Sequence, residues 1–266
     1  MQRDPALVPV PVSGWRTGFL NVLGKEHGVW WRTRRWAVHL LLWIVVLNGF
    51  LLLVNFGEGG RNADFRSPGN FQEIMEVFFR ACSLFVTIGV ITVTQSLMVS
   101  EKQLGTMAWL LTKPVSRPAV VLSKLLASVY VVLFLMLVIP AVLVCVHTRL
   151  VWGSWPIFPG FWIGLGLLAL SHIFYVAFTI MLGTMFSRRG PVSGVAFGFL
   201  VAGMILPNFA PKWLVAATPW TLHAIAAAFG TGQKIPPGWY TPVIATVVLT
   251  LACVAVSLWR FEREEF

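Results

Sequence analysis

Charged residues are scarce in this chain, making up 11% of its 266 residues, whereas a soluble domain carries about 25%. Cysteines are scarce as well. Cys82, Cys145 and Cys253 share no metal-ligand spacing, so we interpret them as small buried hydrophobes. The polar, proline-rich start of the chain lacks the apolar core and small-residue cleavage site of a secretory signal. These absences argue against a soluble domain, a cysteine metal site and a cleaved signal.

Apolar residues are abundant instead: 57% of the chain is hydrophobic and its mean hydropathy is +0.79. A bilayer core is crossed by about 20 apolar residues in a helix. Six such windows are expected to be helices: Trp36–Phe56, Phe71–Val99, Pro118–His147, Phe161–Phe186, Pro191–Leu206 and Thr241–Trp259. The fold class is therefore predicted to be all-α, a polytopic membrane protein with one transmembrane domain. It comprises a tail and amphipathic helix (1–35), a six-helix bundle (36–259) and a short tail (260–266).

The net charge of +10 suggests nucleic acid at first sight, but the cations lie at the ends of the apolar runs, so no nucleic-acid partner is expected. If the N-terminus is cytoplasmic, fourteen of the twenty Lys and Arg residues fall on the inner side and five on the outer side. Arg80 lies within a span. Inner loops are enriched in Lys and Arg, so both termini are expected in the cytoplasm.

Residues 14–35 are predicted to form an amphipathic helix in the inner membrane interface. Trp15, Phe19, Val22, Leu23 and Trp30 fall near one face at helical spacing, and most of the cations lie elsewhere. The segment serves either as an anchor or in a mechanical role.

The segment after the second span, Ser100–Leu126, is polar and flanked by prolines. Ser100 and Gln103 match a capping box, and Leu104, Met107, Ala108 and Leu111 form a one-sided apolar stripe. Lys113-Pro114 ends the pattern. The sequence predicts a short surface helix over Ser100–Thr112 containing Gly105, while Lys124, inside the third span, is expected to snorkel to the cytoplasm. A well-capped loop is the alternative.

This segment resembles the membrane subunits of type-2 ATP-binding-cassette (ABC) exporters, which carry an acidic residue, a Gly-Thr pair, a Leu-rich turn, Pro-x-Ser-Arg and a Lys opening the next span. The matching residues here are Glu101, Gly105, Thr106, Leu110, Leu111, Pro114, Ser116, Arg117 and Lys124. The resemblance extends to the basic elbow helix, the LGTMFSRRGPVSG turn and the tail WRFEREEF.

The resemblance implies a permease subunit in a prokaryotic cytoplasmic membrane, working as a dimer with a second, identical or related copy. The hairpin would be a coupling helix, with Glu101, Gly105 and Thr106 touching the ATPase and Leu104, Met107 and Leu111 anchoring the helix. This chain has no Walker A motif, so it is not expected to be an enzyme or to bind a cofactor itself. ATP and magnesium would belong to a separate ATPase, two copies per transporter.

Two further groups of residues are candidates for the pathway. Glu73, Glu76 and Arg80 form either an outer gate or a solvated outer turn, with Glu76 and Arg80 placed for an i, i+4 ion pair. Gly190, Gly194 and Gly198 give a small-residue face that packs either within the chain or across a dimer.

Two prolines mark further predictions. Pro140 should kink the third span. Thr218, Pro219 and Gly230 predict a short outer-interface helix over Pro219–Phe229, with Thr218 as its cap and Gly230 as its end.

Two other functions stay open. One is a subunit that transmits ATPase work to an extracellular partner without moving cargo. The other is a membrane-embedded enzyme or channel with no ATPase.

Overall fold

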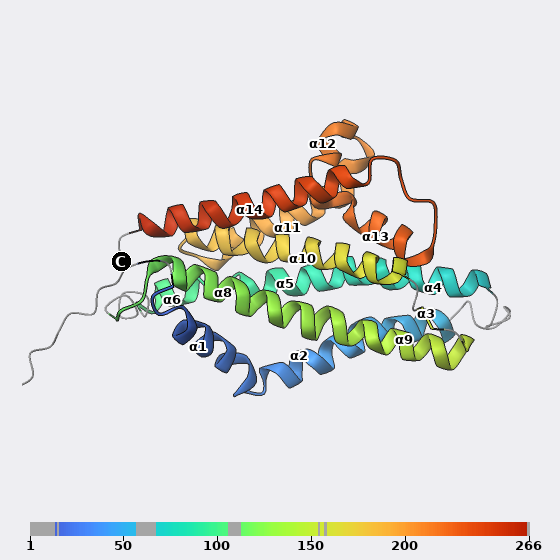
Figure 1. Cartoon of the computed structure of the whole chain (residues 1–266), viewed down its shortest axis with the longest axis horizontal. Coiled ribbons are helices and arrows are strands. Elements are labelled where there is room, and N and C mark those ends of the chain that lie inside the picture. The colour runs from blue at the N-terminus through green and yellow to red at the C-terminus, as the bar shows by residue number, and fades with distance from the viewer. Residues whose placement is uncertain are drawn as a thin grey trace, which may run out of the picture.

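The long apolar runs form helices that lie side by side in a computed structural model (Figure 1). The structure describes residues 14, 16–56, 68–105, 113–153, 155–156 and 159–264. Every regular element in these ranges is a helix, which confirms the all-α class. Within the same ranges, six helices are long and apolar enough to cross a membrane: Arg35–Val54, Phe71–Gln103, Arg117–Trp152, Pro159–Met185, Arg189–Asn208 and Tyr240–Glu262. The chain is a multi-pass membrane protein, as predicted.

Several spans are built from more than one helical stretch. The first three comprise α2 (Arg35–Trp43), η1 (Ile44–Gly49) and α3 (Phe50–Phe56); α4 (Pro68–Ala81), η3 (Cys82–Val86), α5 (Thr87–Thr94) and α6 (Val99–Gln103); and α8 (Arg117–Val131), η4 (Val132–Val138) and α9 (Ile139–Trp152). The last three are α10 (Pro159–Met185), α11 (Arg189–Ile205) with η5 (Leu206–Asn208), and α14 (Tyr240–Glu262). The remaining elements are α1 (Phe19–Trp31), α12 (Lys212–Ala216), η6 (Pro219–Thr221) and α13 (Leu222–Thr231).

The first and last described parts of the chain lie at the same end of the bundle. The backbone N–H of Ser116 donates to the carbonyl oxygen of Thr17 at 3.0 Å, and the neighbouring Arg117 donates to that of Glu264 at 2.6 Å. We call this the α1 end and the opposite one the α13 end (Figure 1).

Helix α10 is the centre of the bundle, packed against α5, α8, α13 and α14. Of its most apolar window, 61% is buried, against 11% for the span that contains α11. The sides of α11, α14 and α2 are therefore left to contact lipid or another chain.

A π-helical stretch interrupts each of the first three spans, and η3 contacts both η1 and η4. In the third span, η4 ends just before Pro140, at the start of α9. A proline inside a helix removes one backbone hydrogen bond and crowds the preceding turn, so a wider local turn accommodates it. Where a kink was predicted at Pro140, the third span has a π-helical stretch directly before the proline.

The connection between α11 and α14 contains the predicted short helix, with different ends. A 3₁₀ turn, η6, leads into α13, which ends at Gly232 with φ +70°. Thr218 does not cap it, because its hydroxyl donates to the carbonyl oxygen of Val215 at 2.7 Å. Gly230 does not end it either, because the helix continues to Thr231. The glycine is instead a point of close contact, since a Cβ at this position would come within 2.0 Å of the Phe79 ring. Helix α13 therefore packs tightly against α4 and α10 instead of lying on the surface.

The buried His172 lies between two spans, as expected for a structural histidine. Its Nδ1 lies 2.6 Å from the carbonyl oxygen of Leu168, and its Nε2 lies 3.3 Å from that of Cys82 in η3. The ring thereby links α10 to the second span.

Candidate functional site

Four charged side chains meet at the α1 end, where α1, α6 and α8 come together. Lys124 Nζ donates to Glu26 Oε1 at 2.8 Å and lies 3.2 Å from Glu101 Oε2. Lys25 Nζ donates to the other oxygen of Glu101 at 2.7 Å. We call Lys25, Glu26, Glu101 and Lys124 the α1-end charge cluster. Its two cations and two anions balance, and it joins three segments that are far apart in sequence.

Helical geometry brings these side chains together. Glu26 lies on the buried face of α1 with Val22 and Trp30, at i, i+4 and i+8. Val22 and Trp30 belong to the predicted apolar face, and the addition is Glu26, a carboxylate that the helix turns toward the bundle. Lys124 is seven residues into α8, roughly 10 Å from its start. Its side chain is only 3% exposed, so it does not snorkel as predicted.

A buried ion pair is costly to desolvate and strongly destabilising when one partner is removed. In this cluster Lys124 and Glu26 are buried, Glu101 is partly buried, and Lys25 covers the exposed side. The cluster therefore holds α1 against the second and third spans.

A second set of polar contacts holds the end of α14 at the same place. Lys102 Nζ donates to the carbonyl oxygen of Thr184 at 2.9 Å and to Glu264 Oε1 at 2.8 Å. Arg117 Nη1 donates to the carbonyl oxygens of Phe261, Glu262 and Glu264 at 3.1, 2.8 and 2.6 Å. A cation at a helix C-terminus satisfies carbonyls that have no partner within the helix. Helices α6, α8, α10 and α14 are thus joined at one end.

The predicted capping box at Ser100 is wrong. The second span continues through α6, and the Ser100 hydroxyl donates to the carbonyl oxygen of Ser96 at 2.6 Å, inside the helix. The helix ends instead at Gln103, and it is followed by Gly105, whose φ of +65° favours glycine. Leu104, predicted as an anchor, is 75% exposed. Thr106, Met107 and Leu111 lie outside the described residues.

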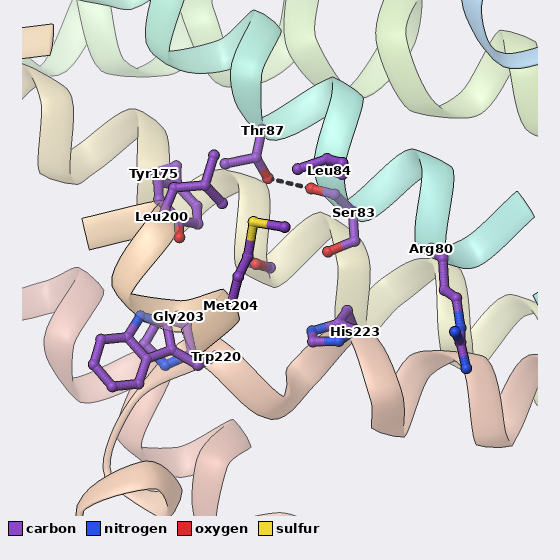
Figure 2. A pocket seen from close by; sticks show the side chains of 12 residues that line it. Arg80, Ser83, Leu84, Thr87, Tyr175, Leu200, Gly203, Met204, Trp220 and His223 are labelled. Carbon is purple, nitrogen blue, oxygen red and sulfur yellow. Dashed lines mark hydrogen bonds between the residues drawn. The ribbon is translucent and has the colours of Figure 1, made fainter. Parts of the chain in front are cut away.

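At the α13 end, Arg80 Nη2 pairs with Glu76 Oε1, as the i, i+4 spacing predicts. Glu73, one turn further out, is exposed. Arg80 also borders a cavity of about 240 Å³ between the second span, α10, α11 and the η6–α13 segment. Figure 2 shows Ser83 and His223 on the side of this cavity nearer Arg80, and Leu200, Met204 and Trp220 on the other.

His223 lies close enough to Arg80 for the guanidinium to act on its imidazole. The His223 side chain is exposed and lines the cavity, but the helices packed around it partly bury the imidazole. This burial, together with the nearby positive charge, lowers the pKa of His223 below its ordinary value, although a hydrogen bond to the backbone of Trp220 acts in the opposite direction.

Residues 41–266 match the model of a family described as a protein of unknown function, DUF2705. The chain belongs to the DUF2705 family. The matched range begins within α2 and includes Glu101, Lys124, Arg80 and His223, whereas α1 with Lys25 and Glu26 precedes it. No curated protein matches the chain.

Gly190, Gly194 and Gly198 of this DUF2705 chain lie on α11. A Cβ at any of the three would meet no atom of the described residues within 4 Å. Close packing of this face inside the chain, one of the two alternatives, is therefore not observed in the described part of the structure.

The sequence singled out Glu101 as an ATPase contact and Lys124 as a snorkelling cation of the DUF2705 chain. It did not predict that both residues pair with side chains of α1. The signal that could have predicted these pairs was Lys124 itself, because a cation inside an apolar span requires a nearby anion. Few acidic residues are available for this at the α1 end of the bundle. The cavity bordered by Arg80 had no comparable signal, because its walls come from four separated segments.

Proposed function

We propose that the chain is the permease subunit of an ABC exporter of type 2, forming a pathway as a dimer and driven by a separate ATPase. The ATPase would dock on the segment 100–112, and the protein would lie in a prokaryotic cytoplasmic membrane with both termini in the cytoplasm. The proposal rests on the resemblance around Ser100–Leu126 and on the distribution of Lys and Arg residues.

The observation that supports it most is the α1-end charge cluster. Glu101 stands in α6, just before the proposed docking segment, and its carboxylate binds Lys25 of α1 and Lys124 of α8. A push on the segment that follows would reach the elbow helix and two spans through short, partly buried ion pairs. This is the arrangement that a mechanical input to the bundle requires.

The exposed side of α11 supports the dimer. It carries the open Gly190, Gly194 and Gly198 face, and small residues allow two membrane helices to approach closely. A dimer through this face would place the two α11 helices next to each other.

The test is co-purification of the chain with candidate ABC ATPases, followed by measurement of ATP hydrolysis in the complex. Gly105→Trp leaves every charge of the cluster intact and places a bulky group beside the docking segment. We expect it to reduce ATPase association at least tenfold, whereas Gly166→Trp, on an open part of α10, should have no effect on association.

Unchanged association and hydrolysis in Gly105→Trp would overturn the coupling proposal. Coupled hydrolysis without movement of any cargo would instead favour the mechanotransmission alternative.

A further inference from the structure

The cavity at the α13 end has two chemically different sides. Toward the second span and α13 it presents the Arg80 guanidinium, the Ser83 hydroxyl and the His223 imidazole (Figure 2). Toward α11 it presents Leu200, Met204 and the Trp220 ring. A site lined in this way fits a molecule with a polar head and a hydrocarbon part.

The polar side of the cavity carries one cation. Arg80 is the one ionised side chain among the residues described as lining the cavity, since Glu73 and Glu76 are not among them. Glu76 binds one amino group of Arg80. A guanidinium has five N–H donors, so the others stay available to a ligand oxygen. Ser83, also on the second span, supplies a hydroxyl donor to the cavity.

The cavity lies beside the membrane-facing flank of the bundle. Met204, on the side formed by α11, is 58% exposed, and the span containing α11 is the least buried of the six in the described ranges. The Trp220 ring lies directly against Gly203, where a side chain would collide with it, so the aromatic wall is held close to α11. With about 240 Å³, the cavity holds a small ligand or one end of a longer one.

We propose that this cavity binds an anionic amphiphile, whose charged oxygen atoms bind Arg80 and Ser83 and whose hydrocarbon part lies against α11. The shared chemistry is an oxyanion on an alkyl chain, as in a fatty acid or a phospholipid. Its interpretation as a cargo site rests on the proposed function, whereas binding itself is measured without any ATPase.

The experiment titrates octyl phosphate, octanoate and octanol into the purified chain in a neutral maltoside detergent and follows complex formation by native mass spectrometry. We expect saturable binding of at least one anion and no comparable binding of octanol. Arg80→Gln should weaken anion binding about tenfold or more, because it removes a charge-assisted contact. Lys234→Gln removes an exposed charge that does not line the cavity and should leave binding unchanged.

Two further variants locate the site without depending on Arg80. Ser83→Ala should weaken anion binding by a smaller factor, and a cysteine introduced by Met204→Cys should be protected from maleimide by the bound anion. Stronger binding of octyl phosphate would indicate a phospholipid-type head, and stronger binding of octanoate a fatty acid. Equal binding of octanol, or anion binding that Arg80→Gln and Ser83→Ala both leave unchanged, would overturn the proposal. That result would leave the coupling proposal standing, because no ATPase takes part in the binding experiment.

Discussion

At the scale of single residues, the decisive positions are charged groups placed where water is scarce. Lys124 illustrates the physical rule: its ammonium group is buried about two turns into α8, and two carboxylates, one from α6 and one from α1, lie within 3.2 Å of it. Without them, burial of a charge would cost several kcal/mol. The cluster is therefore a structural requirement for joining α1, α6 and α8.

Removing the cation should destabilise the bundle strongly. Lys124→Met leaves Glu26 and Glu101 without their shared partner, and breaking a buried pair from one side costs about 3–5 kcal/mol. We expect a large decrease in the thermal unfolding temperature in detergent. Lys234→Met, at an exposed position, serves as the control. The double variant Lys124→Met/Glu101→Gln should recover part of the loss, and no recovery would argue against an electrostatic origin.

His223 should make stability depend on pH. Its pKa is lowered in the folded protein, mainly by burial, so between the folded and unfolded pKa values the unfolded chain binds more protons. The contribution of a neutral His223 to stability is fully present above about pH 6.5, the ordinary histidine value, and is lost as the pH falls toward the folded pKa. The thermal unfolding temperature should fall between pH 7.5 and pH 5, and it should fall less in His223→Gln than in the unmodified protein.

The matched control for this measurement is His27→Gln, at an exposed position on α1. An identical pH dependence in the unmodified protein and His223→Gln would show that His223 contributes nothing to it.

At the scale of elements, close approach decides how α13 is held. The ring of Phe79 fills the place where a side chain at Gly230 would stand, and the backbone of Ala226 occupies the corresponding place at Gly164 of α10. Glycine is needed at both positions because helix backbones and a ring occupy the space of a Cβ. The segment that was predicted to lie in the outer interface, now α13, is therefore packed into the bundle.

Gly230→Ala should be destabilising for this reason. Its Cβ would lie 2.0 Å from the Phe79 ring, and forcing an extra carbon into a packed contact costs about 1–3 kcal/mol. Gly166→Ala is the matched control, because a Cβ there meets nothing within 4 Å and alanine favours a helix by up to about 1 kcal/mol. Opposite shifts of the thermal unfolding temperature are expected, and equal shifts would contradict the packing argument.

At the scale of the whole molecule, burial is uneven around the bundle. The centre is formed by α10 and its neighbours, while the spans containing α11 and α2 expose most of their apolar surface. Lipid satisfies such a surface as well as protein does, so exposure alone does not require a partner. The open glycine face of α11 is what makes a second copy the expected occupant in the proposed dimer.

Gly194→Leu tests that dimer. A Cβ at this position meets nothing within 4 Å in the described part of the chain, so monomer stability should be nearly unchanged. If two copies meet through this face, the larger side chain should reduce the dimer fraction several-fold in size-exclusion chromatography with light scattering. Gly166→Leu, which also points into open space, should not alter it. A dimer fraction unaffected by Gly194→Leu would place any dimer contact elsewhere.

Composition and apolar run length by themselves determined the all-α class and the six spans, because a bilayer demands helices of a minimum length whatever their packing. Local spacing also predicted the Glu76–Arg80 pair, since both residues lie on one helix face. Only the tertiary structure decided that the second span continues past Ser100 to Gln103, that Glu26 faces inward and that Lys124 is buried against it. It also placed Arg80 and His223 beside one cavity. Each of these depends on groups from different helices meeting in space, and a linear pattern does not contain that information.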